Sequence, residues 1–237
     1  CAMLNAAKFV ESSIESYRIG LGHISAINGF APIFDEMPDI NNEPDTGSWL
    51  FELKSNEDCN VTIGNNSWLD LSSIAKGFAI DLINNELKDH NNYLIDIGGE
   101  LSVKGNNKTS AWNIGLQDPK SINNNPLYII STNNWYSIAT SGEYRNYKIK
   151  DNKKISHTIN PKTLNSINNN LLSVTVINYE DIPVTAIADA FATAFNAMGY
   201  TKAYDFANKN NIAALFILEN EGDMSIVKTQ KWYDLKL

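Results

Sequence analysis

The stretch between residues 93 and 149 consists of short apolar runs separated by turns that are rich in asparagine. Such runs are too short for ordinary helices, and separators such as Asn123–Asn125 are typical of turns between strands. We therefore expect strands at Tyr93–Ile97, Trp112–Leu116, Leu127–Ser131, Trp135–Ala139 and Tyr147–Ile149. Outside this stretch, short strands are expected at Leu50–Leu53, Cys59–Ile63, Leu171–Ile177, Ile212–Leu218 and Met224–Lys228.

Apolar residues at helical spacing predict helices on both sides of the strand-rich stretch. We place these helices at Ala2–Ser12, Ser72–Lys88, Ala186–Met198 and Thr201–Asn208. In the second helix, Ile74, Phe78 and Leu82 fall on one stripe, which predicts its buried face. The segment from 32 to 47 is rich in Pro, Asp and Asn and predicts a loop. Helices and antiparallel strands are mixed without a Rossmann or P-loop fingerprint, which indicates an α+β fold.

The charge balance narrows the classes of partner. The net charge is −8 and no basic stripe is present, so binding of nucleic acid, which requires neutralising many phosphates, is not expected. One small phosphorylated ligand needs only a helix N-terminus, local groups or a metal. No run of about 18 apolar residues is present, so no transmembrane helix is expected.

The two cysteines, Cys1 and Cys59, are too few for a four-cysteine zinc site. A disulfide between them is compatible with the sequence, but reduced thiols without a function are the favoured interpretation. Cys1 also fits the lipid-bearing cysteine of a mature lipoprotein, which predicts membrane attachment through a lipid anchor. A fragment boundary fits the same position equally well.

The segment Asp70–Asp81 follows a short apolar stretch and opens a helix with a pair of serines. Serine side chains cap the free N–H groups of a helix start, and that end also attracts anions. Gly77 costs about 1 kcal/mol of helix stability relative to alanine, which indicates close approach of a ligand or another backbone. An ordinary capped helix with a surface lysine at Lys76 is the competing interpretation.

Two glycine-containing turns could also approach a ligand. Gly98–Glu100 follows an apolar strand, and Thr140–Gly142 places two small hydroxyl residues beside a glycine. Glycine lets a backbone approach a ligand closely, and small hydroxyls can line a phosphate or ribose site. The competing interpretations are a plain hairpin turn for the first segment and a turn for the second.

Two further segments carry groups suited to catalysis and metal binding. His157 lies in a polar segment, where an imidazole can take a proton from a hydroxyl near neutral pH. Asp189 and Thr193 are four residues apart, so both face one side of the same helix and offer hard oxygen ligands to Mg²⁺. The competing interpretations are an exposed loop histidine and a buried Asp–Thr hydrogen bond.

Taken in order, these motifs resemble the ApbE-like family of FAD:protein FMN transferases, also called flavin-trafficking proteins. The family patterns are D-L-x-x-x-A-K-G-[YF]-A-x-D, G-G-[DE], W-x-[IV]-x-[IL]-x-x-P, T-S-G-x-Y-R-x-Y, S-H-x-I-[DN]-P-x-T and A-D-A-x-x-T-A. They are similar, respectively, to Asp70–Asp81, Gly98–Glu100, Trp112–Pro119, Thr140–Tyr147, Ser156–Thr163 and Ala188–Ala194. The resemblance covers nearly all of the chain.

The resemblance implies an α+β fold with mixed antiparallel sheets flanked by helices, an ApbE-like, T-fold-related architecture. It implies one domain over 1–237 that is N-terminally incomplete, because an upstream segment with a Met-Gly-Thr motif is usual in the family. The implied activity is Mg²⁺-dependent transfer of FMN from FAD to a Thr or Ser hydroxyl of an acceptor protein, with release of AMP. The implied acceptor is a flavoprotein subunit of a membrane redox complex, on the periplasmic side of the bacterial inner membrane.

The resemblance also implies roles for particular residues. The residues expected to contact FAD are Ser16, Tyr17, Arg18, Asp70, Lys76 and Thr163. The residues expected around Mg²⁺ are Ser73, Asp189 and Thr193. His157 is expected to act as the general base or to orient the attacking hydroxyl.

The chain departs from the family pattern at several of these segments. Arg18 stands where an acidic residue is usual, Leu164 where glycine is usual, and Asn160 where aspartate is common. Ala192 stands where some members have a further metal ligand. Two other functions remain compatible with the sequence, a Mg²⁺-dependent FAD pyrophosphatase and a flavin-binding protein without catalysis.

Overall fold

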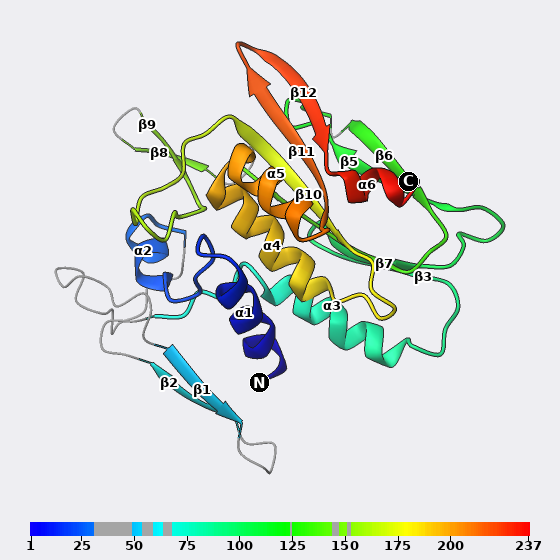
Figure 1. Ribbon diagram of the computed structural model, residues 1–237, viewed down its shortest axis with the longest axis horizontal. Coiled ribbons are helices and arrows are strands. Elements are labelled where there is room, and N and C mark those ends of the chain that lie inside the picture. Colours follow the sequence, from blue (N-terminus) through cyan, green and yellow to red (C-terminus); the bar gives the residue numbers. More distant parts are fainter. Residues whose placement is uncertain (31–48, 54–58, 64–67, 124, 144–146, 151–152) are drawn as a thin grey trace.

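The computed structural model describes residues 1–30, 49–53, 59–63, 68–123, 125–143, 147–150 and 153–237. Within these residues, helices and antiparallel sheets are combined, so the expected α+β fold is confirmed (Figure 1). The loop predicted from 32 to 47 lies outside the described residues, as do residues 144–146 of the Thr140–Tyr147 motif.

The centre of the fold is a six-stranded sheet with the strand order β12-β11-β10-β7-β4-β3. Its strands are β3 (Tyr93–Ile97), β4 (Glu100–Lys104), β7 (Tyr136–Gly142), β10 (Leu171–Asn178), β11 (Ala213–Asn220) and β12 (Asp223–Lys228). Each neighbouring pair in this sheet is antiparallel. Three two-stranded sheets accompany it: β1 (Trp49–Leu53) with β2 (Cys59–Ile63), β5 (Trp112–Gln117) with β6 (Pro126–Thr132), and β8 (Tyr147–Lys150) with β9 (Lys153–Ser156).

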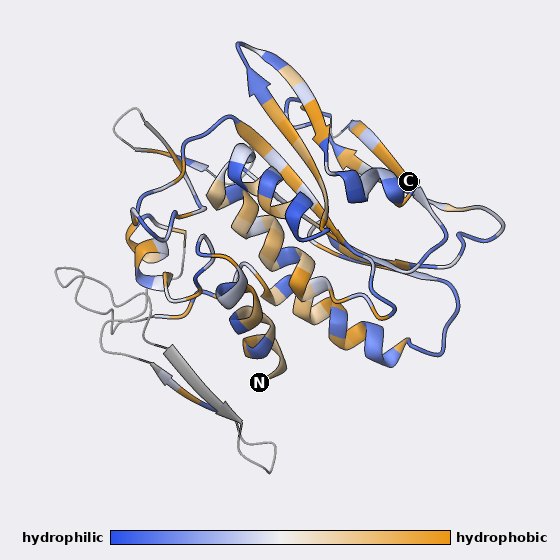
Figure 2. Ribbon diagram, viewed as in Figure 1, coloured by the Kyte–Doolittle hydropathy of each residue, from blue (hydrophilic) through white to orange (hydrophobic). Residues whose placement is uncertain are grey.

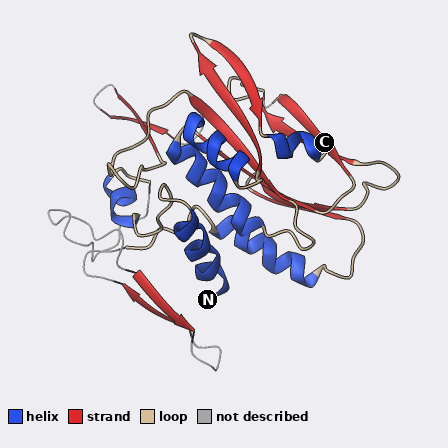
Figure 3. Cartoon of the chain, viewed as in Figure 1, coloured by secondary structure: helices blue, strands red, loops and turns tan. Residues whose placement is uncertain are grey.

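Helices cover one face of the central sheet, and the β5–β6 hairpin covers the other (Figure 3). The helices are α1 (Ala2–Ser13), α2 (Gly22–Ile27), α3 (Ala75–Glu86), α4 (Thr185–Met198), α5 (Tyr200–Lys209) and α6 (Gln230–Asp234). Helix α6 joins the hairpin side, because its Trp232 is buried in the same cluster as the hairpin residues Ile114 and Ile130. No described helix is long and apolar enough to cross a membrane.

Strand β11 (AALFILEN) is apolar along most of its length because both of its faces are covered. Successive side chains of a strand point to opposite faces, so Phe216 packs on the helical side while Leu215 and Ile217 pack on the hairpin side. Both faces are covered, and an unbroken apolar run is therefore favoured over alternation. Figure 2 shows the same concentration of apolar residues along β10, β11 and α4.

Helix α3 approaches α4 closely at Gly77. A Cβ atom at Gly77 would lie 2.6 Å from the carbonyl oxygen of Thr185 and 2.8 Å from Cα of Ala186. The prediction that Gly77 permits close approach is therefore confirmed, and the partner is the backbone of α4. This contact also decides which face of α3 is buried. Ile80 is fully buried, whereas Leu82 is 57% exposed, so the predicted Ile74–Phe78–Leu82 stripe is wrong at Leu82.

The start of α3 differs from the prediction. The helix begins at Ala75, its N-cap residue is Ile74, and no side chain caps it. The two serines lie in the preceding turn, where the Ser72 N–H donates to Oδ1 of Asp70 at 2.9 Å. A short aspartate side chain favours such a turn over continued helix, which explains why the predicted helical start at Ser72 is wrong.

Other elements were not predicted from the sequence. Strand β4 contains the buried polar residues Glu100 and Ser102, which interrupt the apolar run that would predict a strand. Helices α2 and α6 are too short to show a helical period.

Cys1 is disulfide-bonded, so its interpretation as a reduced thiol is wrong.

Replacement of Gly77 by alanine tests the contact between α3 and α4. In an exposed helix this change would stabilise the protein by about 1 kcal/mol. Here the added methyl group meets the α4 backbone, so we expect Gly77→Ala to lower the free energy of unfolding by about 1–3 kcal/mol. Urea denaturation measures the change. Asn85→Ala, at an exposed position of the same helix, is the control and is expected to be neutral or slightly stabilising. A stabilised Gly77→Ala protein would contradict the proposed packing.

Candidate functional site

A cavity of about 460 Å³ brings together most of the predicted site residues. Its wall comes from the segment between α1 and α2, the turn before α3, the β3–β4 turn, strands β5 and β7, the loop after β9, and α4. The predicted residues in this wall are Ser16, Tyr17, Arg18, Asp70, Ser73, Lys76, His157, Asp189 and Thr193. Segments that lie far apart in the sequence therefore form one site.

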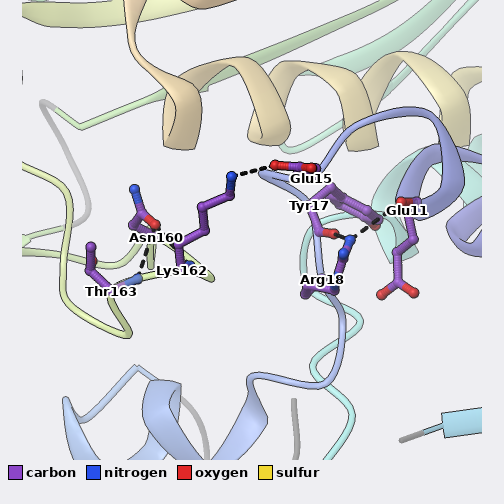
Figure 4. A network of polar contacts seen from close by, with 7 residues as sticks. All are labelled: Glu11, Glu15, Tyr17, Arg18, Asn160, Lys162 and Thr163. Carbon is purple, nitrogen blue, oxygen red and sulfur yellow. Dashed lines mark hydrogen bonds and ion pairs between the residues drawn. The ribbon is translucent and has the colours of Figure 1, made fainter. Parts of the chain in front are cut away.

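Thr163 is the predicted site residue that does not line the cavity. It is exposed, and its backbone N–H donates to Oδ1 of Asn160 at 3.3 Å. Figure 4 shows this pair in the loop that faces the Arg18 segment. The structure therefore does not bring Thr163 together with the other residues.

Asp189 and Thr193 lie one turn apart on the cavity side of α4, as their spacing predicts. Asp189 is 4% exposed, and its Oδ2 accepts the Gly77 N–H at 3.1 Å. Burial, followed by the negative charge of Glu100, raises the pKa of Asp189 to about 8, against the opposing effects of Lys76 and the Gly77 N–H. A buried carboxylate with so little compensation is a favourable ligand for a cation.

Lys76 is held by Glu100, a residue that the sequence singled out only as part of a turn. Nζ of Lys76 lies 2.6 Å from Oε2 of Glu100, which is 2% exposed. Burial raises the pKa of Glu100, whereas its ion pair with Lys76 opposes that rise. The side chain of Lys76 is 44% exposed, as expected of a surface lysine, but its ammonium group is held at the cavity wall by this ion pair.

The Gly-Gly turn between β3 and β4 supplies another part of the wall. Gly98 and Gly99 have φ values of +65° and +101°, a region that favours glycine. The Gly99 N–H donates to Oδ1 of Asp96 at 3.0 Å, which closes the turn. The hairpin-turn interpretation is thus confirmed, and the same turn also faces the cavity.

Two polar contacts attach the segment after α1 to the rest of the site. Oη of Tyr17 lies 3.0 Å from Oγ of Ser73, and Oγ of Ser16 donates to the carbonyl oxygen of Ala194 at 3.0 Å. Burial strongly raises the pKa of Tyr17, so its phenol stays protonated and available for hydrogen bonding. The segment is therefore fixed against both the turn before α3 and helix α4.

Asp70 is already engaged by the protein. Its Oδ2 accepts from Oγ of Ser25 at 2.7 Å, and its Oδ1 accepts the Ser72 N–H. Its own N–H donates to the carbonyl oxygen of Ile19 at 2.7 Å. Asp70 therefore shapes this wall of the cavity, and Ser25 is a supporting residue that no sequence motif indicated.

His157 lies at the cavity on a loop with well-defined internal bonds. The preceding Ser156 accepts at its carbonyl oxygen from Oγ of Ser166 at 2.9 Å, and the Ile167 N–H donates to the carbonyl oxygen of Thr158 at 3.1 Å. The imidazole is partly buried, and its ring centroid lies 6.2 Å from that of Phe30. The interpretation as a simply exposed loop histidine is wrong.

The departures at Asn160 and Leu164 have a local explanation. Oδ1 of Asn160 accepts the N–H groups of Lys162 and Thr163, at 2.9 and 3.3 Å, a role that an aspartate oxygen would also perform. Leu164 has a φ of +56°, which a branched side chain adopts only at a cost. Glycine would adopt this conformation without strain.

Strand β5 supplies an apolar part of the wall that the sequence did not assign to the site. Ile114 and Leu116 line the cavity, as do the small residues Thr140 and Ser141 of β7. The cavity thus has an apolar side and a side rich in carboxylates and hydroxyls. A flat ring system and a phosphorylated group suit these two sides respectively.

The donors on α4 and before α3 fit a hard divalent cation. Asp189, Thr193 and Ser73 offer one buried carboxylate and two hydroxyl oxygens to the same cavity. Mg²⁺ is usually bound by one or two carboxylates together with water and substrate phosphates. Among the described residues, no group of three or more His, Cys, Asp or Glu side chains forms a metal cluster. Water and substrate oxygens would complete the coordination of a Mg²⁺ held by these three groups.

Comparison with known proteins relates this chain to flavin transferases. Residues 4–216 match the model of the ApbE family. The "FAD:protein FMN transferase" proteins of Haemophilus influenzae and Vibrio cholerae are 35% and 36% identical to the chain over 157 residues. These alignments cover 65% of the chain but only 44% and 46% of the relatives, so the matched region is less than half of each relative.

A solved structure extends the likeness to almost the whole chain. The "Flavin Transferase ApbE from Vibrio cholerae" has a TM-score of 0.79 and 26% sequence identity to this chain. The alignment covers 98% of the chain and 75% of that protein. The arrangement of helices and sheets described above is therefore that of ApbE structures.

Replacement of Leu164 tests the strain in the loop after His157. A non-glycine residue in the left-handed region costs about 1–2 kcal/mol, whereas glycine loses about 0.5–1 kcal/mol through greater chain entropy. We expect Leu164→Gly to raise the free energy of unfolding by up to about 1 kcal/mol, as measured by thermal or urea denaturation. Leu164→Ala is the matched control, because it removes the side chain and keeps the unfavourable φ. Equal stability of the two variants would show that strain is absent.

Proposed function

Because the chain belongs to the ApbE family, we propose that it is a Mg²⁺-dependent FAD:protein FMN transferase. The single observation that carries this proposal is the cavity that unites Asp189, Thr193 and Ser73 with Lys76 and His157. In this proposal FAD is the substrate. The flavin ring lies toward the apolar side of the cavity, and the diphosphate lies toward the polar side.

The proposed reaction is a phosphoryl transfer. A Thr or Ser hydroxyl of the acceptor protein attacks the phosphorus of the FMN half of FAD. A new P–O bond forms to the acceptor, the bond from that phosphorus to the bridging oxygen breaks, and AMP leaves with the electron pair. The hydroxyl proton passes to a base, for which His157 is the candidate at the cavity wall.

The protein's own groups have defined tasks in this reaction. Asp189, Thr193 and Ser73 would hold Mg²⁺, which neutralises charge on the diphosphate when bound. The ammonium group of Lys76, fixed by Glu100, adds positive charge at the same wall. Asp70 and the Tyr17–Ser73 contact keep the wall in place.

We also propose the setting of the reaction from family membership. The acceptor would be a flavoprotein subunit of a membrane redox complex, met on the periplasmic side of the inner membrane. What supports this is the likeness to flavin transferases, since the name of the activity requires a protein acceptor.

Mass spectrometry of an acceptor peptide incubated with the chain, FAD and Mg²⁺ tests the proposal. A mass increase equal to FMN, with stoichiometric AMP, is expected from the transferase. Release of free FMN and AMP without peptide labelling would indicate a pyrophosphatase instead. Bound, unchanged FAD would indicate a flavin-binding protein without catalysis.

Asp189→Asn tests the metal site in this assay. The variant keeps the size of the side chain and an oxygen that can accept the Gly77 N–H, but it removes the charge. A metal ion contributes several kcal/mol to charge stabilisation, so transfer at limiting Mg²⁺ should slow about 10²-fold or more. Asp205→Asn, at an exposed position of α5, is the matched control and should leave the rate unchanged. Full activity of Asp189→Asn would remove Asp189 from the metal site.

His157→Asn tests the base. General-base assistance is typically worth about 10²–10⁴-fold in rate, so single-turnover transfer should slow by that factor. The affinity for FAD should remain nearly unchanged, because the histidine acts on the acceptor hydroxyl. An FAD titration of the same variant gives this second value. If affinity and stability fell together with the rate, His157 would only shape the loop.

A further inference from the structure

Arg18 lines the cavity in a position fixed by the backbone. Its Nη1 donates to the carbonyl oxygen of Tyr17 at 2.7 Å and to that of Glu11 at 3.3 Å (Figure 4). These acceptors are neutral, so they orient the guanidinium group without cancelling its charge. A guanidinium has five N–H groups, and these two bonds leave donors on the other nitrogens.

The acidic residues nearest to Arg18 in sequence are engaged elsewhere. Glu15 forms an ion pair with Lys162, which lowers the pKa of Glu15, and the more distant charge of Arg18 adds a smaller lowering (Figure 4). Oε1 of Glu11 accepts the Ile19 N–H at 2.8 Å. Within the described part of the chain, Arg18 has no ion pair with a carboxylate.

The charge of the cavity wall gives Arg18 its importance. The carboxylates in the described wall are those of Asp70, Asp96, Glu100 and Asp189, and the Lys and Arg side chains are Lys76 and Arg18. Lys76 is paired with Glu100, which leaves Arg18 as the cation of this set without a carboxylate partner. Arg18 would therefore attract an anionic group that enters the cavity.

The neighbours of Arg18 indicate which part of a ligand it meets. Tyr17 contacts Ser73, and Ser16 contacts the backbone of Ala194, which directly follows Thr193. The segment that carries Arg18 therefore contacts one proposed Mg²⁺ ligand, Ser73, and the α4 backbone next to another, Thr193. This is the side of the cavity that the diphosphate occupies in the proposed function.

From this geometry we propose that Arg18 donates hydrogen bonds to non-bridging oxygens of the FAD diphosphate and selects diphosphate-containing flavins. The planar guanidinium matches the spacing of two phosphate oxygens, which a lysine does not. The assignment rests on the proposed function, because it takes FAD as the ligand. It makes Arg18 a specificity-determining residue, with no part in bond making or breaking.

Titrations of FAD and riboflavin in EDTA test the assignment without turnover. The proteins are the wild-type chain, Arg18→Gln, Arg18→Lys and the control Lys120→Gln, whose cation pairs with Glu219 away from the cavity. Hydrogen bonds between charged groups are worth about tenfold or more in affinity, so Arg18→Gln should raise the Kd for FAD by at least about tenfold. Its Kd for riboflavin should change less than about twofold, which also shows that the variant is folded.

Two further variants and the dependence on salt test whether the charge and the planar shape of the guanidinium both matter. Arg18→Lys should lie between wild type and Arg18→Gln, because it keeps the charge but not the planar donor pair. Lys120→Gln should bind both flavins as wild type does. Added salt should weaken FAD binding by wild type more than by Arg18→Gln.

Three results would overturn the assignment. Equal losses for FAD and riboflavin in Arg18→Gln would place the guanidinium on the flavin ring instead. Unchanged FAD affinity would show that it contacts no part of the ligand. In both cases wild-type binding of FAD would leave the proposed function standing. If the wild-type chain bound neither flavin, the proposed function and the assignment would fail together.

Discussion

The carboxylate of Asp81 holds the start of helix α4, and the geometry of the site depends on this contact. Its two oxygens accept the N–H groups of Thr185 and Ala186 at 2.6 and 3.0 Å, although the N-cap residue of α4 provides no cap of its own. The first N–H groups of a helix have no partner within the helix, so a carboxylate from α3 satisfies them. One turn earlier on α3, Gly77 lets the two backbones meet. Asp189 is thereby placed one turn into α4, beside the Gly77 N–H.

This arrangement also explains how a buried carboxylate is tolerated at the site. A charge removed from water is costly unless it is compensated. Asp189 accepts one hydrogen bond from the Gly77 N–H and is stabilised by the charge of Lys76, but the negative charge of Glu100 opposes the effect of Lys76. The protein compensates the charge of Asp189 only in part, and this is the physical reason that a cation suits this position. The contact between α3 and α4 thus contributes both to folding and to the proposed ligand site.

The sequence predicted most of the regular elements, because short apolar runs bounded by turns and helical periodicity are local properties of the sequence. It did not predict the burial of Glu100, since nothing local shows that Lys76 lies opposite. It placed Leu82 inside, because periodicity cannot show that Gly77 turns the helix toward α4. The motifs indicated the chemical groups of the cavity but not the residues that hold those groups in place. Ser25 and the apolar strand β5 became visible only in three dimensions.

Because of the contact between α3 and α4, the Asp70–Asp81 motif indicates the fold in related sequences as well as the site. Gly77 and Asp81 are two of the residues that the motif specifies, and both contact the backbone of α4 in this chain. A gene copy that has lost its chemistry would still need both residues to fold. Recognition of the motif therefore identifies the scaffold, and active and inactive copies should be told apart by the residues at positions 189 and 157.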